Sequence, residues 1–237
     1  MPSFSKYLKL IRSQKRKFSG LSYWGLIKYY KRWSHSFNAR DEMHEMPWMT
    51  FEVTDFLQEH SNNQMRVFEY GSGSSTLFWA KRVKEVISIE HDLEWSRKVE
   101  EELAQRKYSN VQLMFIPPEK RDNNKVPEIA DPFGYASDDE NFTAFSFESY
   151  VKKINEFDDS YFDYVVVDGR SRPSCIAASI RKVKQGGYVM LDNSERKYYL
   201  TNTLKMLPIN QWQRLDFCGP IPGSMHFSQT TLFKRLS

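Results

Sequence analysis

The stretch FEYGSGSST (Phe68–Thr76) decides the fold of this 237-residue chain. The run Arg66–Tyr70 predicts a short β-strand, and the residues after Gly73 predict a helix. Glycines at positions 71 and 73 allow a tight turn and close approach of a ligand, and the helix start offers unpaired backbone N–H groups. A dinucleotide-binding fingerprint needs a third glycine where this chain has Thr76, which disfavours a pyrophosphate ligand. The motif therefore predicts a ligand-binding loop, with a plain strand–helix turn as the alternative.

Strands alternate with helices on the C-terminal side of this motif. Four further apolar runs predict strands: Glu85–Glu90, Val111–Ile116, Tyr164–Asp168 and Tyr188–Asp192. A helix is expected from Pro173 until Gly186-Gly187, and another over roughly 196–206. Two more strands, Gln213–Cys218 and Gln229–Lys234, follow each other without a helix. We therefore expect an α/β fold: a doubly wound, mostly parallel seven-stranded sheet with a C-terminal antiparallel strand pair, plus N-terminal helices.

Charge is distributed unevenly along the chain. Residues 1–40 contain ten Lys or Arg and no Asp or Glu, whereas the remainder contains 24 basic and 30 acidic residues. With Pro47 as a boundary, we expect a basic helical arm (1–46) and an α/β domain (47–237). Polar residues 117–146 look like a long insertion that shapes the substrate side of the domain.

The basic arm has the pattern of an interfacial helix. Phe4, Tyr7, Leu8 and Ile11 follow helical spacing, and Ser19-Gly20 interrupts the pattern. We expect residues 1–18 to contact an anionic membrane surface; the alternative is that the arm packs over the ligand cleft as a lid. Nucleic acid is an unlikely partner, because the sequence contains no recognisable base-reading helix or stacking module.

Apolar runs and cysteines indicate the compartment. The longest apolar runs have four or five residues, as in Tyr164–Val167, which is too short to cross a bilayer. Cys175 and Cys218 form neither a disulfide framework nor a metal-binding pattern. We therefore expect a cytoplasmic protein, with peripheral attachment to a membrane through the arm as a further expectation.

A carboxylate ends the second predicted strand. Glu90 lies 19 residues after Gly71, where an acidic side chain can accept hydrogen bonds from both hydroxyls of a ribose. The alternative is a surface glutamate at a strand end.

These motifs, in this order, resemble class I S-adenosylmethionine-dependent methyltransferases. The resemblance runs from about Pro47 to the C-terminus, and it rests on five segments: EYGSGSST, SIEHD, YVVVDGR, GGYVMLDN and TTLFKR. It implies a Rossmann-like methyltransferase domain with S-adenosyl-L-methionine as cofactor. It further implies that the residues Glu69, Gly71 and Gly73 surround the amino-acid part of the cofactor and that Glu90 holds its ribose. Ser75 and Thr76 complete the expected cofactor loop, although many members carry a glycine in place of Ser75.

The sequence also suggests a metal site. Asp168 and the pair Asp192-Asn193 end predicted strands that are neighbours in the sheet order of the family. Two carboxylates and an amide oxygen suit Mg²⁺ or another divalent cation. The arrangement resembles metal-dependent O-methyltransferases of the catechol and caffeoyl-coenzyme A type, and sugar-modifying methyltransferases of macrolide pathways. The alternative is that Asp168 closes the cofactor pocket and Asp192-Asn193 caps a strand–helix turn.

Two residues are candidates for acid–base chemistry. Asp168 and His91 both follow predicted strands at the expected cleft, although a lone His there more often only makes hydrogen bonds. The resemblance implies an O-methyltransferase acting on a small molecule or glycan, with a divalent metal as an optional partner. The alternatives are an NAD(P)-dependent oxidoreductase, and a membrane- or polyanion-binding module with a degenerate cofactor site.

Overall fold

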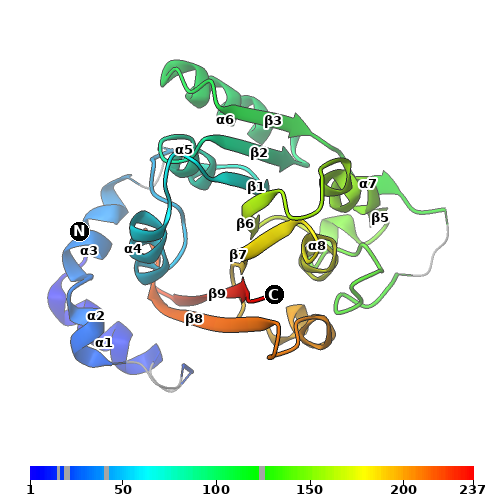
Figure 1. Ribbon diagram of the computed structural model, residues 1–237. Coiled ribbons are helices and arrows are strands. Elements are labelled where there is room, and N and C mark those ends of the chain that lie inside the picture. The colour runs from blue at the N-terminus through cyan, green and yellow to red at the C-terminus, as the bar shows by residue number, and fades with distance from the viewer. Residues whose placement is uncertain (15–16, 19–21, 40–42, 123–125) are drawn as a thin grey trace.

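The computed structural model describes residues 1–14, 17–18, 22–39, 43–122 and 126–237. Its centre is a seven-stranded sheet of order β3-β2-β1-β6-β7-β9-β8 (Figure 1). The strands are β1 (Arg66–Tyr70), β2 (Glu85–Glu90), β3 (Val111–Phe115), β6 (Phe162–Val167), β7 (Val183–Leu191), β8 (Trp212–Pro220) and β9 (Phe227–Arg235). Strands β3, β2, β1, β6 and β7 are parallel, and β9 runs antiparallel between β7 and β8. The predicted doubly wound sheet with its antiparallel C-terminal pair is confirmed.

Helices cover both faces of the sheet because its parallel strands are apolar on both sides. The helices are α4 (Phe51–His60), α5 (Ser74–Ala80), α6 (Leu93–Gln105), α7 (Glu148–Lys152) and α8 (Arg172–Ser179). Val67 of β1 packs with Val53 of α4 and Phe78 of α5 on one face. Its neighbour Phe68 packs on the other face, in the cluster that contains Ile176 of α8. This alternation fixes the register of the strands. Because these strands are parallel, their carboxyl ends meet at one edge of the sheet.

The insertion expected over 117–146 is structured in its described parts, 117–122 and 126–146. Strands β4 (Glu119–Lys120) and β5 (Phe145–Ser146) pair antiparallel at its base, and the short helices η2 (Glu140–Phe142) and η3 (Lys153–Glu156) lie within and after it. Arg121 donates hydrogen bonds to the carbonyl oxygens of Phe145, Gly134 and Tyr135 at 2.9–3.1 Å. These bonds tie both ends of the insertion to its middle.

Two of the helix predictions are wrong, one in its C-terminal boundary and one in the type of helix. Helix α8 ends at Ser179, and Gly186-Gly187 instead lie inside strand β7, where pairing with β6 shifts register. Gly186 has φ +81°, a conformation that favours glycine. The helix expected over 196–206 is replaced by two short 3₁₀ turns, η4 (Lys197–Tyr199) and η5 (Thr203–Met206).

The N-terminal arm packs against the body of the protein. Its helices are α1 (Phe4–Gln14), α2 (Tyr23–Ile27), α3 (Tyr30–Ser36) and η1 (Phe37–Ala39). Tyr7, Ile11 and Trp33 are fully buried in a cluster with Phe51 of α4 and Phe227 of β9. The indole N–H of Trp33 donates a hydrogen bond to the carbonyl oxygen of Ser224 at 2.7 Å.

This packing changes the interpretation of the first helix. The sequence suggested that Tyr7 and Ile11 face a membrane, but both side chains are inside the protein. Lys6, Lys9 and Arg12 remain exposed. The predicted break at Ser19-Gly20 lies outside the described residues.

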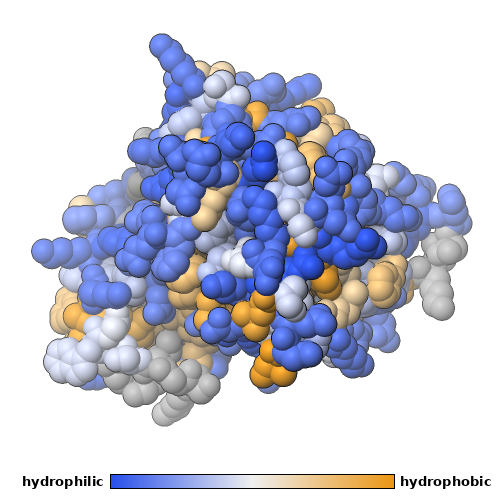
Figure 2. All heavy atoms as spheres, in the orientation of Figure 1, coloured by the Kyte–Doolittle hydropathy of each residue, from blue (hydrophilic) through white to orange (hydrophobic). Residues whose placement is uncertain are grey.

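The face of the molecule shown in Figure 2 is largely hydrophilic, with hydrophobic areas toward its lower edge and smaller ones elsewhere. In the described part of the chain, no helix has both the length and the apolar composition that crossing a membrane requires.

Candidate functional site

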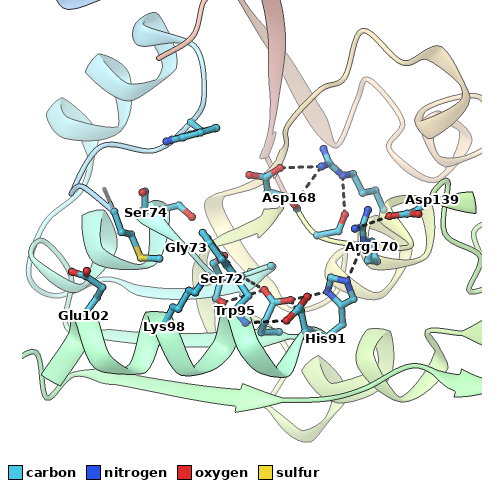
Figure 3. A pocket seen from close by; sticks show the side chains of 18 of the residues that line it. Ser72, Gly73, Ser74, His91, Trp95, Lys98, Glu102, Asp139, Asp168 and Arg170 are labelled. Atoms are coloured by element: carbon cyan, nitrogen blue, oxygen red, sulfur yellow. Dashed lines mark hydrogen bonds and ion pairs between the residues drawn. The ribbon is translucent and has the colours of Figure 1, made fainter. Parts of the chain in front are cut away.

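A cleft of about 1070 Å³ lies at the carboxyl ends of β1, β2 and β6. Its walls come from the glycine loop, the start of α6, the insertion and the turn between β6 and α8 (Figure 3). Six of the predicted site residues line it: Gly71, Gly73, Ser75, Glu90, His91 and Asp168. The structure therefore brings these residues together, as the sequence predicted.

The glycine loop follows β1 and needs glycine at its first turn. Gly71 has φ +93°, and a Cβ atom there would lie 2.8 Å from Cα of Gly169. Its N–H donates to the carbonyl oxygen of Ile89 at 2.9 Å, which holds the loop against the end of β2. Helix α5 then starts at Ser74, and Ser74 and Ser75 of its first turn line the cleft.

Glu69 and Thr76 support this loop from beneath instead of lining the cleft. Glu69 has 0% exposure, and its Oε2 accepts hydrogen bonds from the hydroxyls of Thr76 (2.5 Å) and Ser88 (2.8 Å). The Thr76 oxygen in turn accepts a hydrogen bond from the N–H of Gly73 at 2.9 Å. Burial raises the pKa of Glu69 to about 7, although the side chains of Ser75, Thr76 and Ser88 oppose the shift. In this structure neither Glu69 nor Thr76 lines the cleft, and both side chains support the loop.

Glu90 presents a tightly held carboxylate at the end of β2. Its Oε1 accepts hydrogen bonds from the backbone N–H groups of His91 (2.7 Å) and Asp92 (3.0 Å). Its Oε2 accepts from the N–H (3.0 Å) and the hydroxyl (3.1 Å) of Ser72. Burial favours a higher pKa for Glu90, but these hydrogen bonds and His91 hold its pKa below the ordinary value.

His91 is linked to both sides of the cleft. Its Nδ1 lies 2.7 Å from Oε1 of Glu90, and its Nε2 accepts a hydrogen bond from Nε of Arg170 at 3.2 Å. Arg170 also pairs with Asp139 of the insertion at 2.9 Å, so it lies between Asp139 and His91 (Figure 3). Because the Nε2 lone pair already accepts from Arg170, His91 in this arrangement has no free nitrogen to act as a base.

The three predicted metal ligands, Asp168, Asp192 and Asn193, are arranged around an arginine. Arg172, the first residue of α8, donates to Oδ1 of Asp168 at 3.0 Å and to Oδ1 of Asn193 at 3.1 Å. The Asp192 carboxylate turns away from the cleft and accepts a hydrogen bond from Thr230 at 2.6 Å. Asp192 and Asn193 thus lie behind Arg172, and only Asp168, with 27% of its side chain exposed, reaches the cleft.

Burial dominates the titration of both aspartates. It raises the pKa of Asp192 to about 8, and the nearby Asp168 adds to the shift while Arg172 opposes it. Burial also raises the pKa of Asp168, against the attraction of Arg172. A carboxylate with a raised pKa accepts a proton more readily.

The insertion is anchored beside this group through Asp138. Its Oδ2 accepts hydrogen bonds from Arg196 (2.8 Å), Tyr198 (3.0 Å) and Tyr199 (2.6 Å). Asp138 therefore joins the insertion to the segment that follows β7.

Comparison with known proteins identifies the fold. Neither a protein-family model nor a curated protein matches the sequence. Solved structures do match. SMU.1697c, a putative methyltransferase from Streptococcus mutans in complex with SAH, is 14% identical with a TM-score of 0.55, over 81% of this chain and 100% of that one.

Two further structures are similar. A putative O-methyltransferase from Klebsiella pneumoniae is 13% identical with a TM-score of 0.54, over 100% of this chain and 92% of that one. An rRNA methylase from Streptococcus thermophilus is 14% identical with a TM-score of 0.53, over 78% and 95%. This chain has the class I methyltransferase fold.

Within the methyltransferase fold, the cleft contains residues that the sequence did not single out. Trp95 fits the apolar spacing of α6, yet it is 40% exposed, and its Nε1 donates to the carbonyl oxygen of Ser72 at 2.7 Å. Lys98 and Phe142 also line the cleft. Trp95 lies three residues after the N-cap Asp92, in the first turn of α6, and this position at the sheet edge was the available signal.

Proposed function

We propose that this protein is an S-adenosylmethionine-dependent methyltransferase that acts on a hydroxyl group of a small molecule or glycan. The observation that carries the proposal is the cleft itself. In a methyltransferase fold, it combines the glycine loop, the start of α5 and the Glu90 carboxylate at the ends of β1 and β2. Ligands bind at this edge in open α/β sheets.

The residues present fit the cofactor. Three of the four hydrogen bonds to Glu90 come from backbone N–H groups, and the fourth comes from the rotatable hydroxyl of Ser72. A ribose hydroxyl can replace the Ser72 hydroxyl without breaking a backbone hydrogen bond. Gly73 and Ser75 line the same part of the cleft and leave room for the amino-acid portion.

Methyl transfer requires alignment and removal of one proton. S-adenosylmethionine supplies a methyl group on a sulfonium, which passes to the acceptor oxygen in one in-line displacement that leaves the neutral thioether S-adenosylhomocysteine. Asp168 is the side chain proposed to accept the hydroxyl proton, because it lines the cleft, is 27% exposed and has a raised pKa. His91 holds Glu90 and Arg170 in place.

Charge in the cleft favours a neutral acceptor over a nucleic acid. Six acidic residues line it against three basic ones, which are Lys98, Arg170 and Arg172. Arg170 pairs with Asp139, and Arg172 pairs with Asp168, so neither is free for a phosphate. A polyanion would meet a negative cleft, which opposes binding. An rRNA substrate, as for one of the similar structures, is therefore not favoured.

A divalent cation does not fit the residues predicted to bind it. Asp168 and Asn193 are hydrogen-bonded to Arg172, and Asp192 is turned toward Thr230. Across the described ranges, no three His, Cys, Asp or Glu side chains are grouped as metal ligands. We derive no step through a metal.

Calorimetry tests the cofactor. We expect S-adenosylhomocysteine to bind the full chain and NADH not to bind. Glu90→Ala removes hydrogen bonds worth about 1.5–3 kcal/mol, a ten- to hundredfold loss of affinity. Glu100→Ala, at an exposed position of α6, is the matched control and should leave affinity unchanged. Tight NADH binding without S-adenosylhomocysteine binding would favour an oxidoreductase and refute the proposal.

A further inference from the structure

The guanidinium of Arg172 lies in the space between the predicted metal ligands. It donates to one oxygen each from Asp168 and Asn193, at 3.0 and 3.1 Å, and to the carbonyl oxygen of Asp192 at 2.5 Å. Two further hydrogen bonds go to the carbonyl oxygens of Gly169 (3.0 Å) and Asp168 (3.3 Å). The ends of β6 and β7 are therefore joined by one buried cation.

The surrounding residues are arranged for this cation. The Asn193 amide nitrogen donates to the Ser228 hydroxyl at 3.0 Å, which turns its oxygen toward Arg172. Ser171, which precedes Arg172, has φ +51°, so the chain turns sharply to direct Arg172 back under the strand ends. Arg172 itself is 9% exposed, and all its nitrogen atoms have acceptors.

A fixed positive charge at this position opposes a metal ion. A divalent cation near Asp168 and Asn193 would lie within a few ångströms of the guanidinium, where like charges repel strongly in a partly buried site. Binding of the cation would also break the hydrogen bonds of Arg172 and leave its buried guanidinium unpaired.

We propose that Arg172 is an internal cation that occupies the position of a divalent metal and, as a positioning residue, fixes the Asp168 carboxylate at the cleft. This role deepens the proposed methyl transfer and rests on it. Arg172 holds one oxygen of Asp168 and thereby orients a carboxylate that lines the cleft.

Titration of the full chain with Mn²⁺ alone tests the proposal without any methyl acceptor. The wild type should show no 1:1 Mn²⁺ site. Arg172→Gln removes the charge and keeps hydrogen-bonding capacity, so we expect a 1:1 site at least tenfold tighter than any wild-type binding. Arg172→Lys keeps the charge and should not gain the site. Arg170→Gln, two residues away, is the matched control for loss of one positive charge and should not gain it either.

The outcomes separate the two proposals. A 1:1 Mn²⁺ site in the wild type that is lost in Asp168→Asn overturns the inference, as does a folded Arg172→Gln protein without a site. Equal gains in the Arg170 and Arg172 variants also overturn it. If Arg172→Gln does not fold, Arg172→Ala and the wild-type titration provide the same decision. Failure of S-adenosylhomocysteine to bind the wild type refutes the proposed function instead, and the Mn²⁺ result is unaffected by it.

Discussion

Glu69 should make the stability of the protein depend on pH. It is fully buried beneath the glycine loop, and its pKa is raised to about 7 from an ordinary value of 4.5. The folded state therefore binds this proton more tightly than the unfolded state does. The resulting contribution to the free energy of unfolding is complete below pH 4.5 and is lost as pH rises to 7.

The size of the effect follows from the shift. A difference of 2.5 pKa units corresponds to about 3 kcal/mol in full, of which about 2.5 kcal/mol is lost between pH 5 and pH 8. Glu69→Gln is neutral at every pH and can still accept hydrogen bonds from Thr76 and Ser88. The stability of the variant relative to the wild type should thus rise by about 2–3 kcal/mol over this range.

Urea denaturation at pH 5 and pH 8 measures this difference. Glu100→Gln makes the same chemical change at an exposed position of α6 and should track the wild type at both pH values. Any fixed cost of the Gln amide cancels when the two pH values are compared. Parallel behaviour of Glu69→Gln and the wild type would show that Glu69 is ionised in the folded state at pH 5, and the argument from burial would fail.

Three further predictions concern the loop and the arm. Gly71→Ala forces a side chain into a φ of +93° and against Gly169, so the melting temperature should fall, with a loss of about 2–4 kcal/mol by calorimetry. Trp33→Ala should lower the free energy of unfolding in urea by about 3–5 kcal/mol. Trp24→Ala, at an 84% exposed site, should change this free energy by less than about 0.5 kcal/mol. The basic side chains of α1 stay exposed although its apolar face is buried, so we also propose a purely electrostatic contact of the arm with anionic membranes: reversing the charges of Lys6 and Lys9 should abolish co-sedimentation with anionic vesicles, and unchanged binding would exclude this contact.

The sheet could be predicted because its strands carry strong local signals. The run Tyr164–Val167 is apolar throughout, as a strand buried on both faces must be, and the glycines at 71 and 73 mark the turn after β1. The boundary at Gly186-Gly187 was wrong for a physical reason. Glycine permits both a helix end and a strand irregularity, and only the pairing of β7 with β6 distinguishes them.

The candidate site was predictable only where a strand end decides position. Glu90 and Asp168 reach the cleft because parallel strands end at one edge. The predicted metal ligands Asp168 and Asn193 are hydrogen-bonded to Arg172 of the next helix, and strand ends alone do not reveal what projects between them. The supporting role of Glu69 was likewise hidden, because its depth depends on Thr76 and Ser88 from two other elements.

The insertion held by Arg121 and the sheet edge with the glycine loop contribute different parts of the cleft wall. The base of the insertion is closed by β4 and β5, and its far side is held through Asp138, while the glycine loop and Glu90 belong to the sheet. Changes in length or side chains between these two anchors would alter the part of the cleft that the insertion forms and leave the glycine loop and Glu90 unchanged. Under the proposed function, related chains would change their methyl acceptor by replacing this one segment while keeping the same cofactor site.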